Sequence, residues 1–232
     1  MAERSTTTGP EAVEAAADAA LSLRERKKRQ TARRIWHSAI ALFAERGFDE
    51  VSVAEIAAAA DVSKMTVFNY FPSKEDLVMS PMERHTGEAA EAVRDRAPGV
   101  SAVAALRAGF AAGLERFDPA TGLSDDRFVL DVIRLIHRTP ALTLRATTAW
   151  GRAANELLAA ELLAQDPAGD RLRAQVAAAQ LMSVRLALTN ENHRRMLAGE
   201  RAADVLPEAL ENARRSFDMA EHGLGDYGTR PA

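Results

Sequence analysis

The apolar residues of this chain recur at helical spacing almost continuously from residue 24 to residue 222. Two stripes spaced three or four residues apart illustrate this: Ile35, Ala39, Leu42 and Phe43 near the start, and Leu172, Val176, Ala179, Ser183 and Leu186 near the end. Strands would show alternating β-branched and aromatic residues, and tight hairpins would show Asn-Gly or Asp-Gly, but neither pattern occurs. The sequence therefore predicts an all-α fold.

Caps and breaks divide this pattern into about nine helices. Gly47 suits the end of the first helix, and Ser52 with Glu55 forms a capping box for the second. Ser63 can cap the third helix, whereas Pro81 should kink the fourth or open a new first turn. The expected helices span about residues 24–46, 53–60, 64–71, 74–77, 100–117, 125–138, 140–165, 167–198 and 204–222.

Composition excludes several classes of protein. The chain has no cysteine, which removes disulfides, thiolate metal sites and a cysteine nucleophile. Its longest stretch without a charged residue, from Ala174 to Val184, is shorter than the ~20 residues that cross a bilayer. The N-terminus lacks an apolar signal-peptide core. We therefore expect a cytoplasmic protein, and the absence of a Gly-rich phosphate loop or similar fingerprint predicts no cofactor.

Two short helices near the N-terminus carry the functional signal. Residues 53–60 and 64–71 are separated by a three-residue break, and these are the proportions of a helix-turn-helix. At 100° per residue, Val67 lies on one edge of the second helix, while Met65 and Asn69 lie on the opposite edge. An amide can pair with adenine and an apolar group can touch the thymine methyl. The outer edge therefore predicts base reading in duplex DNA.

The motifs around this helix pair extend from Arg34 to Leu77. They comprise Ala-Leu-Phe at 41–43, Gly-Phe at 47–48, and the segments 52–60, 62–71 and 74–77. With them, this part of the chain resembles the DNA-binding domain of TetR-type (tetracycline-repressor-like) transcriptional regulators. Asp61 and Met65 depart from the family pattern, in which glycine is common at both positions.

The resemblance implies an all-helical homodimer with three DNA-binding helices and a larger ligand-binding and dimerisation domain. On this chain the expected layout is a disordered tail at 1–23, a helix-turn-helix domain at 24–77, a ligand-binding and dimerisation domain at 78–222, and a tail at 223–232. The resemblance assigns the DNA groove to Lys64, Met65, Thr66, Phe68 and Asn69, and phosphate contacts to Ser52, Tyr70 and Lys74. For Phe68, a place in the core stays an open alternative.

A basic cluster precedes the helix pair. Seven of the residues from Arg24 to Arg34 are Lys or Arg and one is acidic, although the formal net charge of the chain is −3. Such a run can be a solvated face. Its position directly before the helix-turn-helix favours contacts with DNA phosphates, for which Arg33 and Arg34 are the candidates.

The C-terminal helices carry candidates for a ligand pocket and a dimer interface. The pocket candidates could equally be plain core, and they are Phe110, Leu114, Phe128, Val132, Arg134, Ile136, His137, Trp150, Asn155, Met182 and Arg185. The resemblance places the dimer interface on the last two helices, where the stripes are Val176, Ala179, Ser183, Leu186, Leu206, Leu210, Ala213 and Phe217. Residues 134–142 are similar to the subset of this family related to the mycofactocin regulator, which implies an acyl-CoA-like ligand. Arg134, Arg138 and Arg145 could then meet its phosphates.

The expected function is a DNA-binding transcriptional regulator, a repressor that a small-molecule ligand releases from a palindromic operator. One alternative is a DNA-binding regulator that no metabolite controls. Another is a helical enzyme or ligand carrier in which the N-terminal helices only pack. No two histidines have i,i+3 or i,i+4 spacing, so the sequence predicts neither a metal site nor a catalytic residue.

Overall fold

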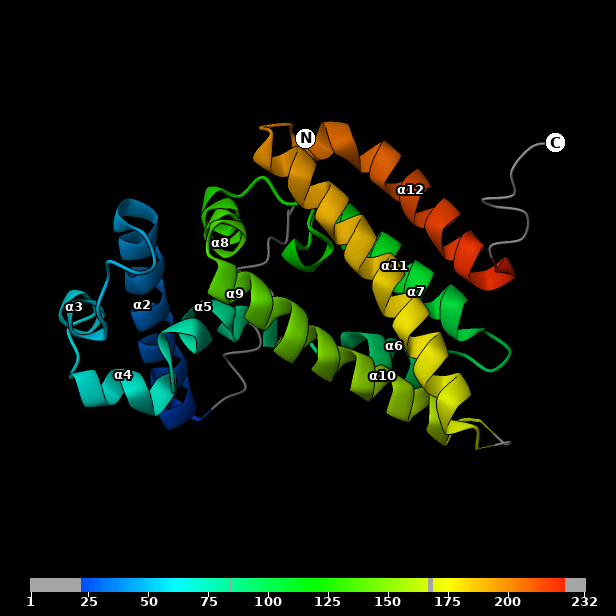
Figure 1. Cartoon of the computed structure of the whole chain (residues 1–232), viewed down its shortest axis with the longest axis horizontal. Coiled ribbons are helices and arrows are strands. Elements are labelled where there is room, and N and C mark those ends of the chain that lie inside the picture. The colour runs from blue at the N-terminus through cyan, green and yellow to red at the C-terminus, as the bar shows by residue number, and fades with distance from the viewer. Residues whose placement is uncertain (1–21, 84, 167–168, 224–232) are drawn as a thin grey trace, which may run out of the picture. The chain divides into compact units, whose positions relative to one another are not determined.

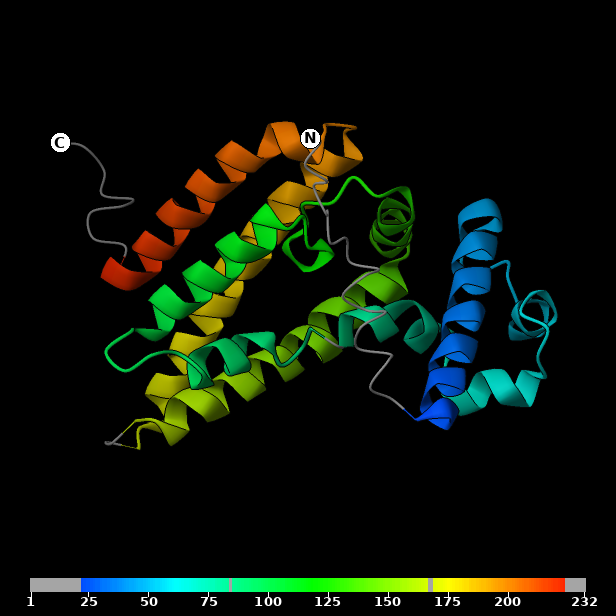
Figure 2. The ribbon, with the colours of Figure 1, turned by 180° about the vertical axis from the view of Figure 1, so that it is seen from behind.

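The computed structural model describes residues 22–83, 85–166 and 169–223, and every regular element in these ranges is helical (Figures 1 and 2). The chain divides into two compact units, the first ending at Lys74 and the second beginning at Glu75. Tails were expected at residues 1–23 and 223–232, and of these, residues 1–21 and 224–232 lie outside the described residues. The predicted all-α fold is confirmed.

The N-terminal unit is built from α2 (Leu23–Arg46), α3 (Val53–Ala59) and α4 (Lys64–Tyr70). Their apolar stripes meet in one small core, in which the Phe43 and Phe48 rings are 5.1 Å apart. The buried side chains of this core are Ile35, Ala39, Ile40, Phe43, Phe48, Val51, Ile56, Ala57, Ala60, Val67 and Phe71. The core fixes which face of α4 points outward.

The first helix starts earlier than its apolar stripe suggests. Ser22 caps α2 and forms a capping box with Glu25, and Leu23 is the first helical residue. The expectation of a tail through residue 23 is therefore wrong by two residues. A cap needs only a hydroxyl and a carboxylate three residues apart, and the helix can begin before any side chain packs against the core.

The C-terminal unit contains the remaining helices. Their bounds are α5 (Lys74–Glu83, whose first residue closes the N-terminal unit), α6 (Glu88–Arg94), α7 (Ala102–Glu115), the 3₁₀ turn η1 (Pro119–Thr121), α8 (Arg127–Arg138), α9 (Pro140–Arg145), the π-helical turn η2 (Ala146–Trp150), α10 (Gly151–Ala164), α11 (Arg171–Leu197) and α12 (Ala202–His222). In this unit α11 packs between α10 and α12, and α12 also packs against α7 (Figure 1).

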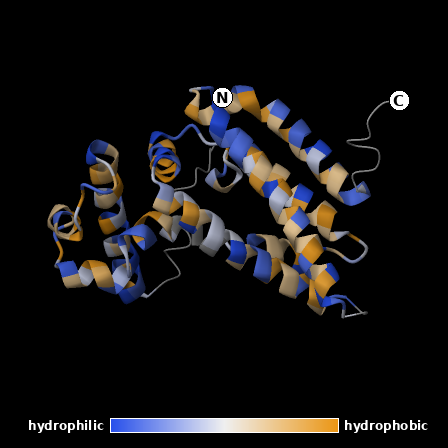
Figure 3. Ribbon diagram, viewed as in Figure 1, coloured by the Kyte–Doolittle hydropathy of each residue, from blue (hydrophilic) through white to orange (hydrophobic). Residues whose placement is uncertain are grey.

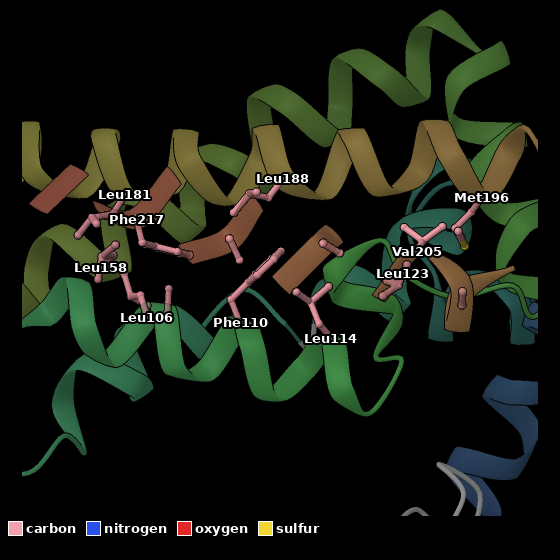
Figure 4. Packing of buried hydrophobic residues seen from close by; sticks show 14 of the residues in the cluster. Leu106, Phe110, Leu114, Leu123, Leu158, Leu181, Leu188, Met196, Val205 and Phe217 are labelled. Carbon is pink, nitrogen blue, oxygen red and sulfur yellow. The ribbon is translucent and has the colours of Figure 1, made fainter. Parts of the chain in front are cut away.

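The core of the C-terminal unit lies between α7, α10, α11 and α12. Hydrophobic and hydrophilic bands alternate along α11 and α12 (Figure 3). Figure 4 shows side chains from different helices meeting in the core, among them Leu106 and Phe110 of α7 and Phe217 of α12. The Phe110 and Phe217 rings are 6.2 Å apart. Burial of these apolar groups is the main force holding the helices together.

Three local features differ from the sequence expectation. The short helix α6 was not predicted, and its buried face is made of Ala89, Ala90 and Val93. Helix α5 continues through Pro81 to Glu83, whereas we expected an end near residue 77. The helix expected at 140–165 contains the π-helical turn η2 between α9 and α10. Small alanine faces and local changes of helical register give little periodic signal in a sequence.

Among the described helices, none combines the length and the apolar character that crossing a bilayer requires.

Candidate nucleic-acid interface

Helix α3 is fixed at both ends by its own sequence. The Ser52 hydroxyl accepts a hydrogen bond from the Glu55 amide at 3.3 Å, and the Glu55 carboxylate accepts from the Ser52 amide at 2.9 Å. This is the predicted capping box. Bonds from Ser52 come first in holding the pKa of Glu55 down at about 2, and Arg46 on α2 adds a further bond of 2.7 Å. The Arg46 brace was not predicted, because it joins residues on different helices.

The turn between α3 and α4 is tight and slightly strained. The Asp61 amide bonds to the Ala58 carbonyl and the Val62 amide to the Ala57 carbonyl, which is the paired bonding of a Schellman helix end. Asp61 adopts φ +50° there. This is the left-handed conformation that glycine adopts most easily. Glycine is also the residue that is common at this position in the family that the sequence resembles.

Helix α4 presents a sharply divided surface. Ser63 caps it as predicted, accepting a bond from the Thr66 amide at 3.0 Å. Val67 is only 1% exposed, whereas Met65 is 68% and Phe68 is 40% exposed. Lys64 and Asn69 are exposed as well, and Thr66 is half-buried. The structure therefore brings the predicted groove-facing residues to one surface and places Phe68 outside the core, where the Lys64 ammonium lies 5.9 Å from its ring centroid.

Two predicted phosphate contacts already have partners within the chain. The Lys74 ammonium donates to the Phe48 carbonyl at 2.7 Å and to the Val51 carbonyl at 3.3 Å, and it lies 4.3 Å from the Phe48 ring centroid. The Ser52 hydroxyl donates to Glu55 at 2.7 Å. Both residues thus hold the loop between α2 and α3 in place. Lys74 keeps one donor for a phosphate, whereas the amide and the hydroxyl of Ser52 are both bonded within the capping box.

The other predicted backbone contacts are placed at the surface of the same unit. Arg33 and Arg34 are exposed on α2, and Tyr70 is half-buried at the end of α4 with its ring 6.4 Å from that of Phe71. A helix-turn-helix with an outward amide, apolar side chains and flanking cations has the chemistry needed to enter a DNA groove.

This unit also matches known proteins. Residues 35–80 match the family described as bacterial regulatory proteins, tetR family. The N-terminal helix-turn-helix is thus similar to the DNA-binding domain of this family. A stretch of 40 residues is 55% identical to the HTH-type transcriptional regulator LuxR of Vibrio harveyi, covering 17% of this chain and 20% of that protein.

A longer similarity extends beyond residues 35–80. The chain is 31% identical over 140 residues to the HTH-type transcriptional regulator TcmR of Streptomyces glaucescens, which is 60% of this chain and 57% of TcmR. The chain thus matches less than two thirds of the length of these curated relatives. The solved structure of GusR from Salmonella enterica has a TM-score of 0.52 at 22% identity, covering 84% of this chain and 96% of GusR, and it shows the shared fold.

The candidate ligand residues that follow residues 35–80 differ in burial. Phe110, Leu114 and Ile136 are buried, and the first two belong to the same core as Phe217. Phe128, Val132 and Met182 are half-buried, whereas Arg134 and His137 are exposed. The side chain of Trp150 lies outside the described residues. The structure therefore places Phe110 and Leu114 in the core, which was the alternative stated for the pocket candidates.

The polar candidates differ in whether their side chains have hydrogen-bond or ion-pair partners. The buried Asn155 side-chain oxygen has no hydrogen-bond partner among the described residues. Arg185 is largely buried, with Glu88 at 3.7 Å, and burial lowers the pKa of its guanidinium while Glu88 raises it. Two of the three arginines considered for acyl-CoA phosphates are paired, because Arg134 bonds Asp131 and Arg145 bonds Asp76.

A group of polar contacts between elements of the C-terminal unit was not predicted from the sequence. His193 of α11 is buried, and its ring lies 6.0 Å from that of His137 on α8. Burial first, and then the neighbouring His137, lower the pKa of His193 to about 4. The adjacent Asn192 donates to the Thr121 carbonyl at 2.8 Å. These pairs join residues far apart in the chain, so no local spacing could have indicated them.

The predicted dimer residues separate by helix. On α11, Val176, Ala179, Ser183 and Leu186 are all exposed, and Leu172 extends the same stripe. On α12, Ala213 and Phe217 are buried in the core of their own unit, and Leu206 and Leu210 pack partly against it. The α12 half of the predicted interface is therefore wrong for the two buried residues. An apolar stripe on a helix looks the same in a sequence whether it meets its own core or another subunit.

Proposed function

We propose that this chain is a DNA-binding transcriptional regulator that represses transcription from a palindromic operator until a small-molecule ligand releases it. The observation that carries the proposal is the outward face of α4, on which Met65, Phe68 and Asn69 are exposed while Val67 anchors the helix to the core. A short helix held so firmly, with its polar and apolar tips outward, suits insertion into a major groove.

Base reading is assigned to the exposed edge of α4. The Asn69 amide offers a donor and an acceptor that match adenine, and Met65 and Phe68 offer apolar contact to thymine methyl groups. Lys64 and Arg34 supply charge for flanking phosphates. We assign the sequence-specific role to Asn69 and the positioning of the loop before α3 to Lys74, because the Lys74 ammonium is already bonded to two carbonyls.

Dimerisation and ligand binding are assigned to the C-terminal unit. The exposed apolar stripe of α11 supports a two-fold interface, which would set two α4 helices at successive major grooves. The unpartnered Asn155 oxygen and the buried Arg185 support a ligand site among α10 and α11. The internal pairing of Arg134 and Arg145 leaves less free positive charge for an acyl-CoA than the sequence suggested.

The location follows from the partner. A regulator that reads operator DNA must share a compartment with the chromosome, and we therefore propose a cytoplasmic protein.

The rival functions differ in what they require. A regulator without a metabolite would leave the C-terminal unit as a dimerisation module only. Thermal denaturation in the presence of a metabolite panel separates the two readings, because a ligand of the native state raises the melting temperature. A helical enzyme or ligand carrier would leave the outward face of α4 without a role, and the relatives TcmR and LuxR are described as transcriptional regulators.

The test is binding to duplex DNA from upstream of the chain's own gene, with a scrambled duplex of equal length as competitor. We expect specific binding whose affinity falls steeply with salt. The variant Asn69→Ala should lose about 1–3 kcal/mol on the operator while binding to scrambled DNA hardly changes. Equal losses on both duplexes would show that Asn69 does not read bases. If selection from a random library also yielded no motif, the regulator proposal would fail.

A further inference from the structure

The first turns of α2, residues 23–30, form a basic rod that packs against none of the other described residues. Every described residue from Ser22 to Gln30 is exposed, and the first half-buried positions are Thr31 and Ala32. At 1.5 Å per residue, about 12 Å of helix therefore precedes the core of the N-terminal unit. This segment also lies before residue 35, where the match to the TetR-family domain begins.

Positive charge surrounds this rod on most sides. Within the described residues no ion pair or hydrogen bond engages the side chains of Arg24, Arg26, Lys27, Lys28 or Arg34. The single acid of the segment, Glu25, is used by the cap, where the Ser22 amide donates to it at 3.0 Å. That bonding, led by the Ser22 hydroxyl, lowers the pKa of Glu25. The rod therefore presents uncompensated cationic groups to a partner.

The arrangement of positive charges destabilises the first turns of α2. Basic residues in a first helical turn oppose the positive end of the helix dipole, and like charges four residues apart, such as Arg24 and Lys28, repel. The capping box of Ser22 and Glu25 offsets part of this cost. A polyanion lying along the rod would remove the remaining repulsion between its cations. Binding a polyanion would therefore stabilise this part of the helix.

The composition of the rod favours nucleic acid over a membrane surface. A helix that lies on a lipid surface needs an apolar face opposite its cations. Between Leu23 and Gln30 the only apolar residue is Leu23 itself. The N-terminal turns of α2 and the helix α4 also lie at the same end of the N-terminal unit in both views (Figures 1 and 2). A duplex that receives α4 is therefore within reach of the rod.

We propose that the rod, residues 23–30, is a second DNA-contact element in addition to α4 and Arg34, and that it binds phosphates of the same duplex independently of base sequence. The proposal rests on the DNA-binding function proposed above and adds a site to it. The rod contributes affinity and salt dependence, while α4 contributes base selection. Specificity is then set by α4 alone, and the rod strengthens binding to every duplex by the same factor.

The experiment compares two triple variants with equal loss of charge. Arg26→Gln, Lys27→Gln and Lys28→Gln together neutralise the rod, and Arg127→Gln, Arg152→Gln and Arg201→Gln neutralise three exposed arginines of the C-terminal unit. Fluorescence anisotropy measures affinity for operator and for scrambled duplex from 50 to 200 mM salt. Circular dichroism and thermal melting establish that both variants keep the fold.

Neutralising the rod should reduce the slope of log affinity against log salt by up to about 2.7, or about 0.9 for each lost phosphate contact. Across this fourfold range of salt, the wild-type chain then loses about 40-fold more affinity than the rod variant. The ratio of operator to scrambled affinity should stay constant, and the control triple should leave the slope unchanged.

Each other result has a distinct meaning. An unchanged slope in the rod variant, or an equal change in the control triple, would show that the rod does not contact DNA phosphates. The proposed function would not be affected by that result. A wild-type chain that binds no duplex at 50 mM salt overturns both. Tighter binding of the wild-type chain to phosphatidylserine vesicles than to scrambled duplex, lost in the rod variant, would assign the rod to a lipid surface and overturn its role on DNA.

Discussion

At the residue scale, Asp61 shows how the helix-turn-helix accepts an unfavourable residue. Its φ of +50° is needed so that Asp61 and Val62 can bond back to the last carbonyls of α3. A side chain in the left-handed region meets the following carbonyl, and this raises the energy of the folded state. The two backbone hydrogen bonds set the geometry of the turn, and Asp61 takes up the backbone conformation that they require.

Replacing Asp61 by glycine should therefore stabilise the N-terminal unit. We expect Asp61→Gly to raise the free energy of unfolding by about 0.5–1 kcal/mol, since glycine adopts this φ without steric cost. Asp61→Ala removes the same charge but keeps the strained φ, and it should give no such gain. Urea denaturation followed by circular dichroism measures both. An equal gain from alanine would attribute the effect to the carboxylate instead.

His193 is the second residue whose environment decides its behaviour. Burial in the C-terminal unit and the nearby His137 ring hold its pKa at about 4, against 6.5 for an unperturbed imidazole. The unfolded chain therefore takes up a proton on His193 before the folded chain does. Its contribution to stability is complete above pH 6.5 and is lost as the pH falls toward 4.

Acidification from pH 7 to pH 5 should cost about 2 kcal/mol of stability through His193 alone. The variant His193→Gln has no such proton uptake, so its stability should fall less over this interval. His222→Gln, which changes an exposed histidine at the end of α12, serves as the matched control and should follow the wild-type chain. Parallel pH profiles for wild type and His193→Gln would show that the imidazole is not held neutral.

At the element scale, Gly122 sets how closely η1 approaches α11. It has φ +78°, and an added Cβ would lie 2.4 Å from the Thr189 carbonyl oxygen and 3.2 Å from Asn192 Cβ. Two independent constraints thus require glycine, one from the backbone conformation and one from the facing helix. The approach also brings the Thr121 carbonyl within reach of the Asn192 amide.

Alanine at position 122 should therefore force η1 away from α11. We expect Gly122→Ala to lower the free energy of unfolding by more than about 2 kcal/mol, because it combines strain with overpacking against backbone. Gly109 in α7 is the control, since nothing lies within 4 Å of an added Cβ there. Gly109→Ala should stabilise the helix by up to about 1 kcal/mol. Thermal and chemical denaturation distinguish these opposite signs.

At the scale of the whole molecule, the exposed stripe of α11 decides the assembly that we propose. Leu172, Val176 and Leu186 stay in water in the single chain, although the same helix buries Leu181 and Leu188 on its other side. Burying such side chains against a second copy stabilises an association by about 25 cal/mol for each Å² of apolar surface covered. The stripe is therefore the surface on which a dimer would depend.

A charge placed on this stripe should separate the subunits without unfolding them. We expect Leu186→Glu to shift the chain from dimer to monomer at micromolar concentration and to weaken operator binding by at least about tenfold, since two linked half-sites bind more tightly than one. Leu157→Glu on α10 is matched in exposure, at 47% against 48% for Leu186, and should remain dimeric. Analytical ultracentrifugation decides the outcome. A dimeric Leu186→Glu variant would place the interface elsewhere.

The sequence alone determined the features that depend on neighbouring residues. The caps at Ser52 and Ser63, the end of α2 at Gly47 and the outward edge of α4 all follow from spacings of a few residues, and the structure places them as expected. A cap or a helical face is made from residues within one or two turns, so its chemistry is complete in the local sequence.

Only the tertiary structure decided which partner each side chain meets. In the structure, Lys74 bonds to the loop after α2, and Arg145 pairs with Asp76. His193 is buried beside the His137 ring, and Ala213 and Phe217 are buried in the core of the C-terminal unit. The α11 and α12 stripes have the same period in the sequence, yet one is exposed and the other packs against the core of its own unit. Contacts between residues far apart in the chain depend on how the helices pack, and helical periodicity specifies only that a face is apolar.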